Sequence, residues 1–524
     1  MTSYADDRPL SLYMLLKKIT TLALPTVLLQ ITSLLPFPLT TLHLGLHHQD
    51  LLPPYALANL TGNIIGVMLI VGSLTSCDTL LPIYYKSNPS KMFLIMLRSF
   101  LITISLILPS ILLILLSTPT SGPLRTLLLT LNVSPLLIPN ITIYLLNFTP
   151  SYLFLLLSNL INKFLLAQDV AWMQVTVGLF TVVFHYTCLR VYVGMEGGEG
   201  DEGGSEETMG KVGWLHCMTP VVEFGLRLGA VMVFKPYGEE TVVRPRFEEV
   251  FMERDDRVVP FIRQLTMSIN GILSLSEWLY WEVLTFMISG LQDNVEISSQ
   301  AVVYSLIPIF YMLPLGVAIG SGVVVGQKIG ERREEEVRRC LRLTGGLGMA
   351  CGIFMSCFCA VFKNSLIKTF TNQAEVIETL EGIWPGVCVF IFVDQNFAVN
   401  GGILRSLGMQ STMSKLILFV LYGFGVPLAY VVVVKMEKGI DGLWDIMFLP
   451  YIFLILLMAK KWVYVDLREV IDRLNSSDED KGKGDDTFGL LTNEDFNDED
   501  DDELDDDELE MTESGDVEMI EYNE

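Results

Sequence analysis

Three acidic residues lie inside apolar stretches of the sequence that are long enough to cross a membrane. Glu277 and Glu282 stand in one such stretch, at 276–290, and Asp394 stands in a later one. A charged side chain at the bilayer centre costs about 2.5–3.5 kcal/mol on insertion scales, so such an acid needs a partner, a proton or water. Burial favours a protonated carboxyl group, which can bind and release H⁺ when its exposure changes. These three acids are therefore candidate sites for binding protons or cations.

Glu277 and Glu282 are five positions apart, which separates them by about 140° around a helix. They therefore contact different parts of one wide cavity, or their helix is distorted. Trp278, Tyr280 and Trp281 lie between them. Aromatic faces beside a carboxylate suit organic cations, although aromatic residues in membrane helices more often serve packing.

Two other acids have simpler explanations. Glu223 precedes Arg227 by four residues, so an ion pair within one helix accounts for both. Asp78 lies near the end of its apolar stretch, where solvation, capping and function explain it equally well. The eight cysteines lie almost entirely in apolar segments, with no CxxC pair beside a histidine. That pattern predicts neither a disulfide framework nor a metal site.

The apolar residues, 51% of the 524, occur in uninterrupted blocks rather than scattered along the chain. Blocks of about twenty residues have the length that crosses a bilayer. We therefore predict an all-α polytopic membrane protein with twelve transmembrane helices. The predicted spans are 18–43, 54–82, 92–117, 136–162, 170–193, 212–235, 259–290, 299–326, 343–362, 379–402, 414–435 and 443–461.

A weak internal repeat divides these spans into two sets of six. The segment KITTLALP at 18–25 corresponds to RQLTMSIN at 263–270, and a second pair of segments follows at nearly the same offset. Six spans per half place both halves in the same orientation, so we predict two six-helix bundles related by a pseudo-twofold axis along the membrane normal. Lys and Arg gather in alternate loops, which predicts that both termini are cytoplasmic.

The distribution of apolar and charged residues divides the chain into predicted segments. From residue 478 to residue 524 the chain has 23 acidic residues and two lysines, which accounts for most of its net charge of −25. Such a segment is expected to be disordered. We predict an N-terminal cytoplasmic segment at 1–17, an N-lobe at 18–235 with a Gly/Glu-rich loop at 194–210, a cytoplasmic linker at 236–258, a C-lobe at 259–463 and an acidic disordered tail at 464–524.

Several motifs resemble the multidrug and toxic compound extrusion (MATE) family, most strongly between about 258 and 436. The segment SEWLYWE at 276–282 is similar to the family's C-x-E-W-W-x-[YF]-E signature. The segment at 299–330 resembles its eighth span, and SCDTLLPIYY at 76–85 resembles its second. In the segment at 394–430 an acid is followed eleven positions later by an arginine, Arg405, as in the family's G-V-x-R-G-x-G-x-Q motif.

The resemblance implies roles for individual residues. Glu277, Glu282 and Asp394 correspond to acids that line a C-lobe cavity and serve proton coupling and cation binding. Tyr304 and Tyr311 match aromatic positions of that cavity. We add Trp278 to the cavity-lining candidates and regard Asp78, Arg405, Glu223 and Arg227 as structural or secondary.

The sequence also departs from the family pattern. Ile83 replaces a usual glutamine, Val324 a usual arginine, and Ser305 an acid that animal members carry after the matched tyrosine. Asp394 in place of glutamate is typical of plant-like members.

The resemblance implies a secondary active antiporter that exports organic cations or other small xenobiotics or metabolites in exchange for H⁺ by alternating access. A Na⁺-coupled exporter of the same fold, an intramembrane lipid-modifying enzyme and a transport-dead sensor are the alternatives. All five histidines lie in the first half, away from the three acids, which argues against acid–base catalysis. We predict no enzyme activity, no cofactor and no nucleic-acid partner. We expect a monomer in the plasma membrane or an endomembrane such as a vacuole.

Overall fold

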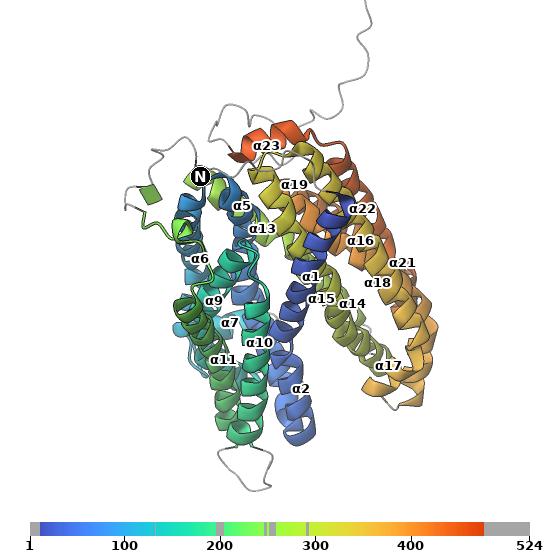
Figure 1. Cartoon of the computed structure of the whole chain (residues 1–524). Coiled ribbons are helices and arrows are strands. Elements are labelled where there is room, and N and C mark those ends of the chain that lie inside the picture. The colour runs from blue at the N-terminus through green and yellow to red at the C-terminus, as the bar shows by residue number, and fades with distance from the viewer. Residues whose placement is uncertain are drawn as a thin grey trace, which may run out of the picture. The chain divides into compact units, whose positions relative to one another are not determined.

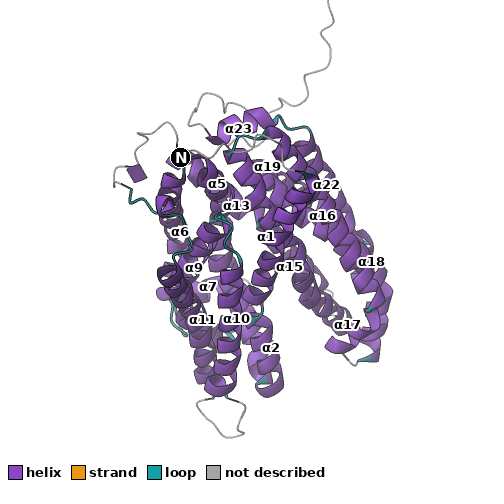
Figure 2. Ribbon diagram, viewed as in Figure 1, coloured by secondary structure: helices purple, strands orange, loops and turns teal. Residues whose placement is uncertain are grey.

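The structure, a computed structural model, is built from helices. It describes residues 11–130, 133–194, 204–245, 249–250, 258–289, 293–371 and 373–475, and no strand occurs among them. Figure 2 shows these helices joined by short loops. All of the described residues fall in one compact unit. The prediction of an all-helical fold is confirmed.

The first half of the chain contains the helices coloured blue to green in Figure 1. They are α1 (Leu12–Leu34), α2 (Pro36–His47), α3 (Leu52–Gly62), α4 (Met68–Ser73), α5 (Thr75–Ser87), α6 (Met92–Leu115), α7 (Pro123–Thr130), α8 (Ile138–Phe148), α9 (Ser151–Leu166), α10 (Trp172–Cys188) and α11 (Gly204–Phe234). Short π-helical turns at Asn63–Val67 and Leu189–Val193 extend α3 and α10.

The second half contains the helices coloured yellow-green to red. They are α13 (Phe261–Ser274), α14 (Ser276–Ser289), α15 (Asn294–Gly330), α16 (Glu334–Val361), α17 (Lys363–Phe370), α18 (Ala374–Ser406), α19 (Gln410–Ile417), α20 (Val426–Tyr430), α21 (Gly439–Ile446), α22 (Phe448–Val463) and α23 (Leu467–Asn475). Two π-helical segments, Leu418–Gly425 and Val431–Lys435, lie on either side of α20.

Ten stretches of helix among the described residues are long and apolar enough to cross a membrane. The bent pair α8 and α9, which meet at 46°, raises this number to eleven if it forms one span. The seventh predicted span corresponds to α13 and α14, which are separated at Leu275. Each predicted span thus falls on helical structure, while the count of twelve stays a prediction.

Two predicted boundaries were wrong. Helix α11 begins at Gly204, so the last part of the predicted loop at 194–210 is helical, and residues 195–203 lie outside the described part. Glu206 and Glu207 occupy the first turn of α11, and Lys211 Nζ lies 2.7 Å from Glu207 Oε1. Acids at a helix N-terminus and an i, i+4 ion pair both favour helix there.

The predicted disordered tail at 464–524 also begins too early, because residues 467–475 form α23. The apolar side chains of this helix recur every three or four residues and are buried: Leu467, Val470, Ile471 and Leu474. This spacing places them on one face, which packs against the rest of the protein. The remaining residues of the predicted tail, from 476 onward, lie outside the described part of the chain.

We predict that replacing Ile471 with alanine destabilises the protein. The Ile471 side chain is 5% exposed, and truncating a buried isoleucine to alanine costs about 2–5 kcal/mol. Thermal unfolding of the detergent-purified protein would show a lower melting temperature. Glu469→Ala, an exposed position on the same helix, serves as the control. An unchanged melting temperature for Ile471→Ala would contradict the packing of α23.

The two halves of the chain touch along α15. Helices α1 and α5 of the first half pack against α15, and Figure 1 shows α1 and α15 side by side. Two glycines of α15 permit this approach. A Cβ atom on Gly316 would lie 2.5 Å from Val27 Cα, and one on Gly320 would lie 2.6 Å from Ala23 Cα. Because real Cβ atoms do not approach backbone atoms this closely, any larger residue would push the helices apart.

Candidate functional site

Glu277 lies in the first turn of α14, directly after the break at Leu275. Its side chain is 5% exposed. Glu277 Oε1 accepts hydrogen bonds from the Tyr451 hydroxyl of α22 at 3.1 Å and from Trp281 Nε1 at 3.2 Å. Trp281 is one turn further along α14. Glu277 is thus held by neutral donors from two helices, the arrangement that a buried acid requires.

Asp394 lies near the middle of α18 and is 2% exposed. It interacts electrostatically with Glu277. Tyr311 of α15 and Tyr451 of α22 are close enough to interact with both acids. Arg405 interacts with Glu277 through space. The structure therefore combines Glu277 and Asp394, from α14 and α18, into one buried pair of acids beside two tyrosines.

Glu282 has a different environment. Its side chain is half-buried, and Glu282 Oε1 accepts a hydrogen bond from the Tyr304 hydroxyl of α15. Among the described residues, no hydrogen-bond partner of its side chain also bonds the Glu277 side chain. The separation of about 140° on a helix thus corresponds to different hydrogen-bond partners for the two acids. The two environments adjoin, because the ring of Trp281, which bonds Glu277, lies 6.4 Å from that of Tyr304.

The candidate aromatic residues have different surroundings in the structure. Tyr304 donates to Glu282, and Tyr311 interacts with Glu277 and Asp394. Trp278, in contrast, is 38% exposed and makes no side-chain hydrogen bond to a described residue. Its neighbour Trp281 is the residue that bonds Glu277. The i, i+4 spacing of Glu277 and Trp281 could have predicted this contact, whereas no local pattern indicates Tyr451.

The two secondary acids form ion pairs. Arg227 Nη2 lies 2.6 Å from Glu223 Oε1 on the same helix, as their spacing predicts, and Arg227 also donates to the Ser158 hydroxyl at 2.6 Å. Asp78 Oδ1 accepts from Lys163 Nζ of α9 at 2.5 Å. Asp78 and Glu223 therefore have cationic partners, unlike Glu277 and Glu282, whose hydrogen-bond partners are neutral.

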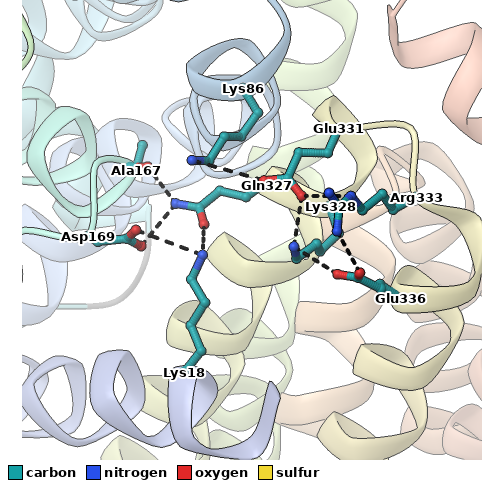
Figure 3. Close-up of polar contacts among 9 residues, drawn as sticks. All are labelled: Lys18, Lys86, Ala167, Asp169, Gln327, Lys328, Glu331, Arg333 and Glu336. Carbon is teal, nitrogen blue, oxygen red and sulfur yellow. Dashed lines mark hydrogen bonds and ion pairs between the residues drawn. The ribbon is translucent and has the colours of Figure 1, made fainter. Parts of the chain in front are cut away.

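A polar network joins the two halves at the end of α15 (Figure 3). Gln327 is its centre. The Gln327 Oε1 atom accepts from Lys18 Nζ of α1 at 2.5 Å, and Gln327 Nε2 donates to Ala167 O and to Asp169 Oδ1, both at 2.9 Å. Lys18 Nζ also lies 3.8 Å from Asp169 Oδ2. One residue of the second half thus contacts three groups of the first.

Acidic and basic residues extend this network into the second half. Lys328 Nζ lies 2.7 Å from Glu331 Oε2 and 2.8 Å from Glu336 Oε2. Arg333 Nη1 lies 2.9 Å from Glu336 Oε1. Lys86 of the first half reaches Glu331 at 4.0 Å. Figure 3 shows Lys86 approaching Glu331 from the first half of the chain.

A further contact between the halves lies nearby. The Thr79 hydroxyl of α5 donates to Arg405 O at 2.5 Å and accepts from Gln410 Nε2 at 2.8 Å. The sequence motifs at 76–85 and 394–430 therefore meet in the structure.

Comparison with known proteins agrees with this fold. The MatE family model matches residues 271–431, which include α14, α15 and Asp394. Multidrug and toxin extrusion protein 1 of Danio rerio is 25% identical over 432 residues, which cover 80% of this chain and 67% of that protein. Multidrug and toxin extrusion protein 2 of Mus musculus is 29% identical over 192 residues, which cover 36% of this chain and only 33% of that protein.

Among solved structures, the eukaryotic MATE transporter AtDTX14 has the same fold. Its TM-score is 0.72 at 15% sequence identity, and the superposition covers 88% of this chain and 99% of AtDTX14. Members of the MATE family are transporters and not enzymes. Residues 271–431 are thus similar to the MatE family, and the chain has the fold of solved multidrug and toxic compound extrusion transporters, which are multi-pass membrane proteins.

Proposed function

We propose that this chain is a secondary active antiporter that exports organic cations or other small molecules in exchange for H⁺. The observation that carries the proposal is the buried pair Glu277 and Asp394, which lies among tyrosines inside helices long enough to span a membrane. Two nearby acids cannot both ionise easily in a buried site. Such a pair favours binding of a proton or of a cation, and either ligand excludes the other.

Alternating access requires that the two halves separate at one end and close at the other. In this structure the Gln327 network joins them at the end of α15, and the glycine contacts of α15 with α1 lie on the same interface. Lys18, Lys86 and Arg333 at that end belong to the segments that the distribution of basic residues assigns to the cytoplasm. We propose that this conformation is closed to the cytoplasm, and that opening it breaks the Gln327 contacts.

The substrate class and the membrane are also proposals. The relatives named for multidrug and toxin extrusion support small organic substrates. Carboxylates beside aromatic rings favour cations among these. We place the protein in the plasma membrane or an endomembrane such as a vacuole, with both termini cytoplasmic.

Transport by the purified protein in lipid vesicles tests the proposal. An imposed pH gradient should drive accumulation of a fluorescent organic cation, and a protonophore that collapses the gradient should stop it. A Na⁺ gradient alone should have no effect. Accumulation driven by Na⁺ and insensitive to the protonophore would replace H⁺ by Na⁺ as the coupling ion. Absence of flux under both gradients would exclude a transporter of this substrate class.

A further inference from the structure

Two cysteines of the second half, Cys359 of α16 and Cys388 of α18, lie against each other. Their thiols form a side-chain hydrogen bond. The Ser356 hydroxyl of α16 donates to Cys388 O at 2.9 Å, and Trp384 Nε1 of α18 donates to Cys359 O at 3.1 Å. Because a serine side chain is short, its hydrogen bond to a backbone carbonyl requires that the two helix backbones approach closely at this level.

The spacing along both helices leads to the same pairing. Gly348 of α16 packs against Val399 of α18, since a Cβ atom on the glycine would lie 2.9 Å from Val399 Cβ. Cys359 follows Gly348 by eleven positions, and Cys388 precedes Val399 by eleven. Eleven residues complete about three helical turns. Both cysteines therefore return to the face along which α16 and α18 pack against each other.

The two thiols lie near one end of these membrane-crossing helices. Cys359 is in the last turn of α16, and the Lys363 ammonium group interacts electrostatically with Cys388. Glu336, in the network around Gln327, is 23 positions from Cys359, which is about 35 Å along a helix. Since we place that network at the cytoplasmic side, the thiols lie toward the opposite side, away from the reductants that keep cytosolic thiols reduced.

We propose that Cys359 and Cys388 are an oxidative modification site, where a peroxide converts the two thiols into a reversible disulfide bond. Hydrogen peroxide oxidises one thiol to a sulfenic acid and leaves one water molecule; the second thiol then displaces the hydroxyl group as a second water molecule. Cys388 is half-buried and Cys359 is buried, so the peroxide reacts first with Cys388, because exposure favours oxidation. A dithiol reductant restores both thiols by exchange. The reaction does not depend on the proposed transport function.

The disulfide bond joins α16 to α18, the helix that carries Asp394. It closes the chain between Cys359 and Cys388 into a loop, and a cross-link of this kind restricts the unfolded chain. We therefore expect the oxidised protein to unfold at a higher temperature than the reduced protein.

Mass spectrometry of the purified full chain tests the proposal. The protein is treated with hydrogen peroxide, quenched in acid, denatured in the presence of N-ethylmaleimide and digested without reductant. We expect a linked pair of peptides that contain Cys359 and Cys388, about 2 Da lighter than the two free peptides because two hydrogen atoms are lost. Maleimide labelling of both cysteines should be lost. Dithiothreitol added after the peroxide should remove the linked pair and restore the labelling.

Two serine variants make the test specific. Cys388→Ser should abolish the linked pair and the rise in melting temperature. Cys357→Ser is the matched control, because Cys357 is an exposed cysteine of the same helix, about 200° around it from Cys359; this variant should keep both.

Equal maleimide labelling of Cys359 and Cys388 before and after peroxide would overturn the proposal. A disulfide bond from either residue to another cysteine, or a sulfinic acid at Cys388 without a linked peptide, would also overturn it. A linked protein that melts no higher than the reduced protein would contradict the stabilising role.

Discussion

Asp394→Asn abolishes exchange driven by a pH gradient while the protein still folds and inserts. Asparagine keeps the size of the buried side chain but cannot bind and release a proton. Since Asp394 is 2% exposed and interacts with Glu277, its loss leaves the pair without one of its two ionisable groups. We expect the initial rate of cation accumulation in vesicles to fall about 100-fold. This factor is near the upper end of the change in affinity that one bound ligand usually causes in another.

A variant that carries both Glu277→Gln and Asp394→Asn tests whether the two acids act together. Because Glu277 and Asp394 act on each other, the effects of Glu277→Gln and Asp394→Asn should not add. The double variant should be no slower than the slower single variant. Glu378→Gln, an exposed acid on the same helix as Asp394, should transport at the wild-type rate. Undiminished exchange by Asp394→Asn would remove this residue from the coupling mechanism.

Gly320→Ala shifts the protein away from the conformation described above. A Cβ atom at this position would lie 2.6 Å from Ala23 Cα on α1, and a backbone atom cannot move aside as a flexible side chain can. Overpacking of this kind costs about 1–3 kcal/mol. Separation of the two halves removes this clash. We therefore expect the equilibrium between the closed and the separated conformation to shift by about 5- to 150-fold.

Distances between spin labels measure this shift. Labels at Ser87 and Glu335, two exposed positions next to Lys86 and Glu336 in the chain, report separation of the halves once the eight native cysteines are replaced. The Gly320 variant should show a larger population of long distances. Gly322→Ala is the control, because a Cβ atom there would meet nothing nearer than Ser406 Cβ at 3.8 Å. Identical distance distributions for wild type and Gly320→Ala would contradict a tight α1–α15 contact in the dominant state.

Local patterns in the sequence predicted much of this molecule. Apolar blocks predicted the membrane helices because hydrophobic length alone decides whether a segment can span a bilayer. The i, i+4 spacing predicted the pair Glu223 and Arg227, since helix geometry places such residues together. The motifs around Glu277 and Asp394 indicated the transporter family. Boundaries were less predictable, as α23 shows, because a short amphipathic helix within a charged segment depends on a surface to pack against.

The tertiary structure decided which residues surround each acid. Tyr451, which bonds Glu277, is 174 positions away in the sequence, and Lys163, which pairs with Asp78, is 85 positions away. Gln327 meets Ala167 across 160 positions. The rotation and depth at which two helices pack determine these contacts, and neither is set by the periodicity of a single helix. The five-residue spacing predicted that Glu277 and Glu282 point in different directions if their helix is undistorted. Only helix packing decided that the first joins Asp394 and the second joins Tyr304.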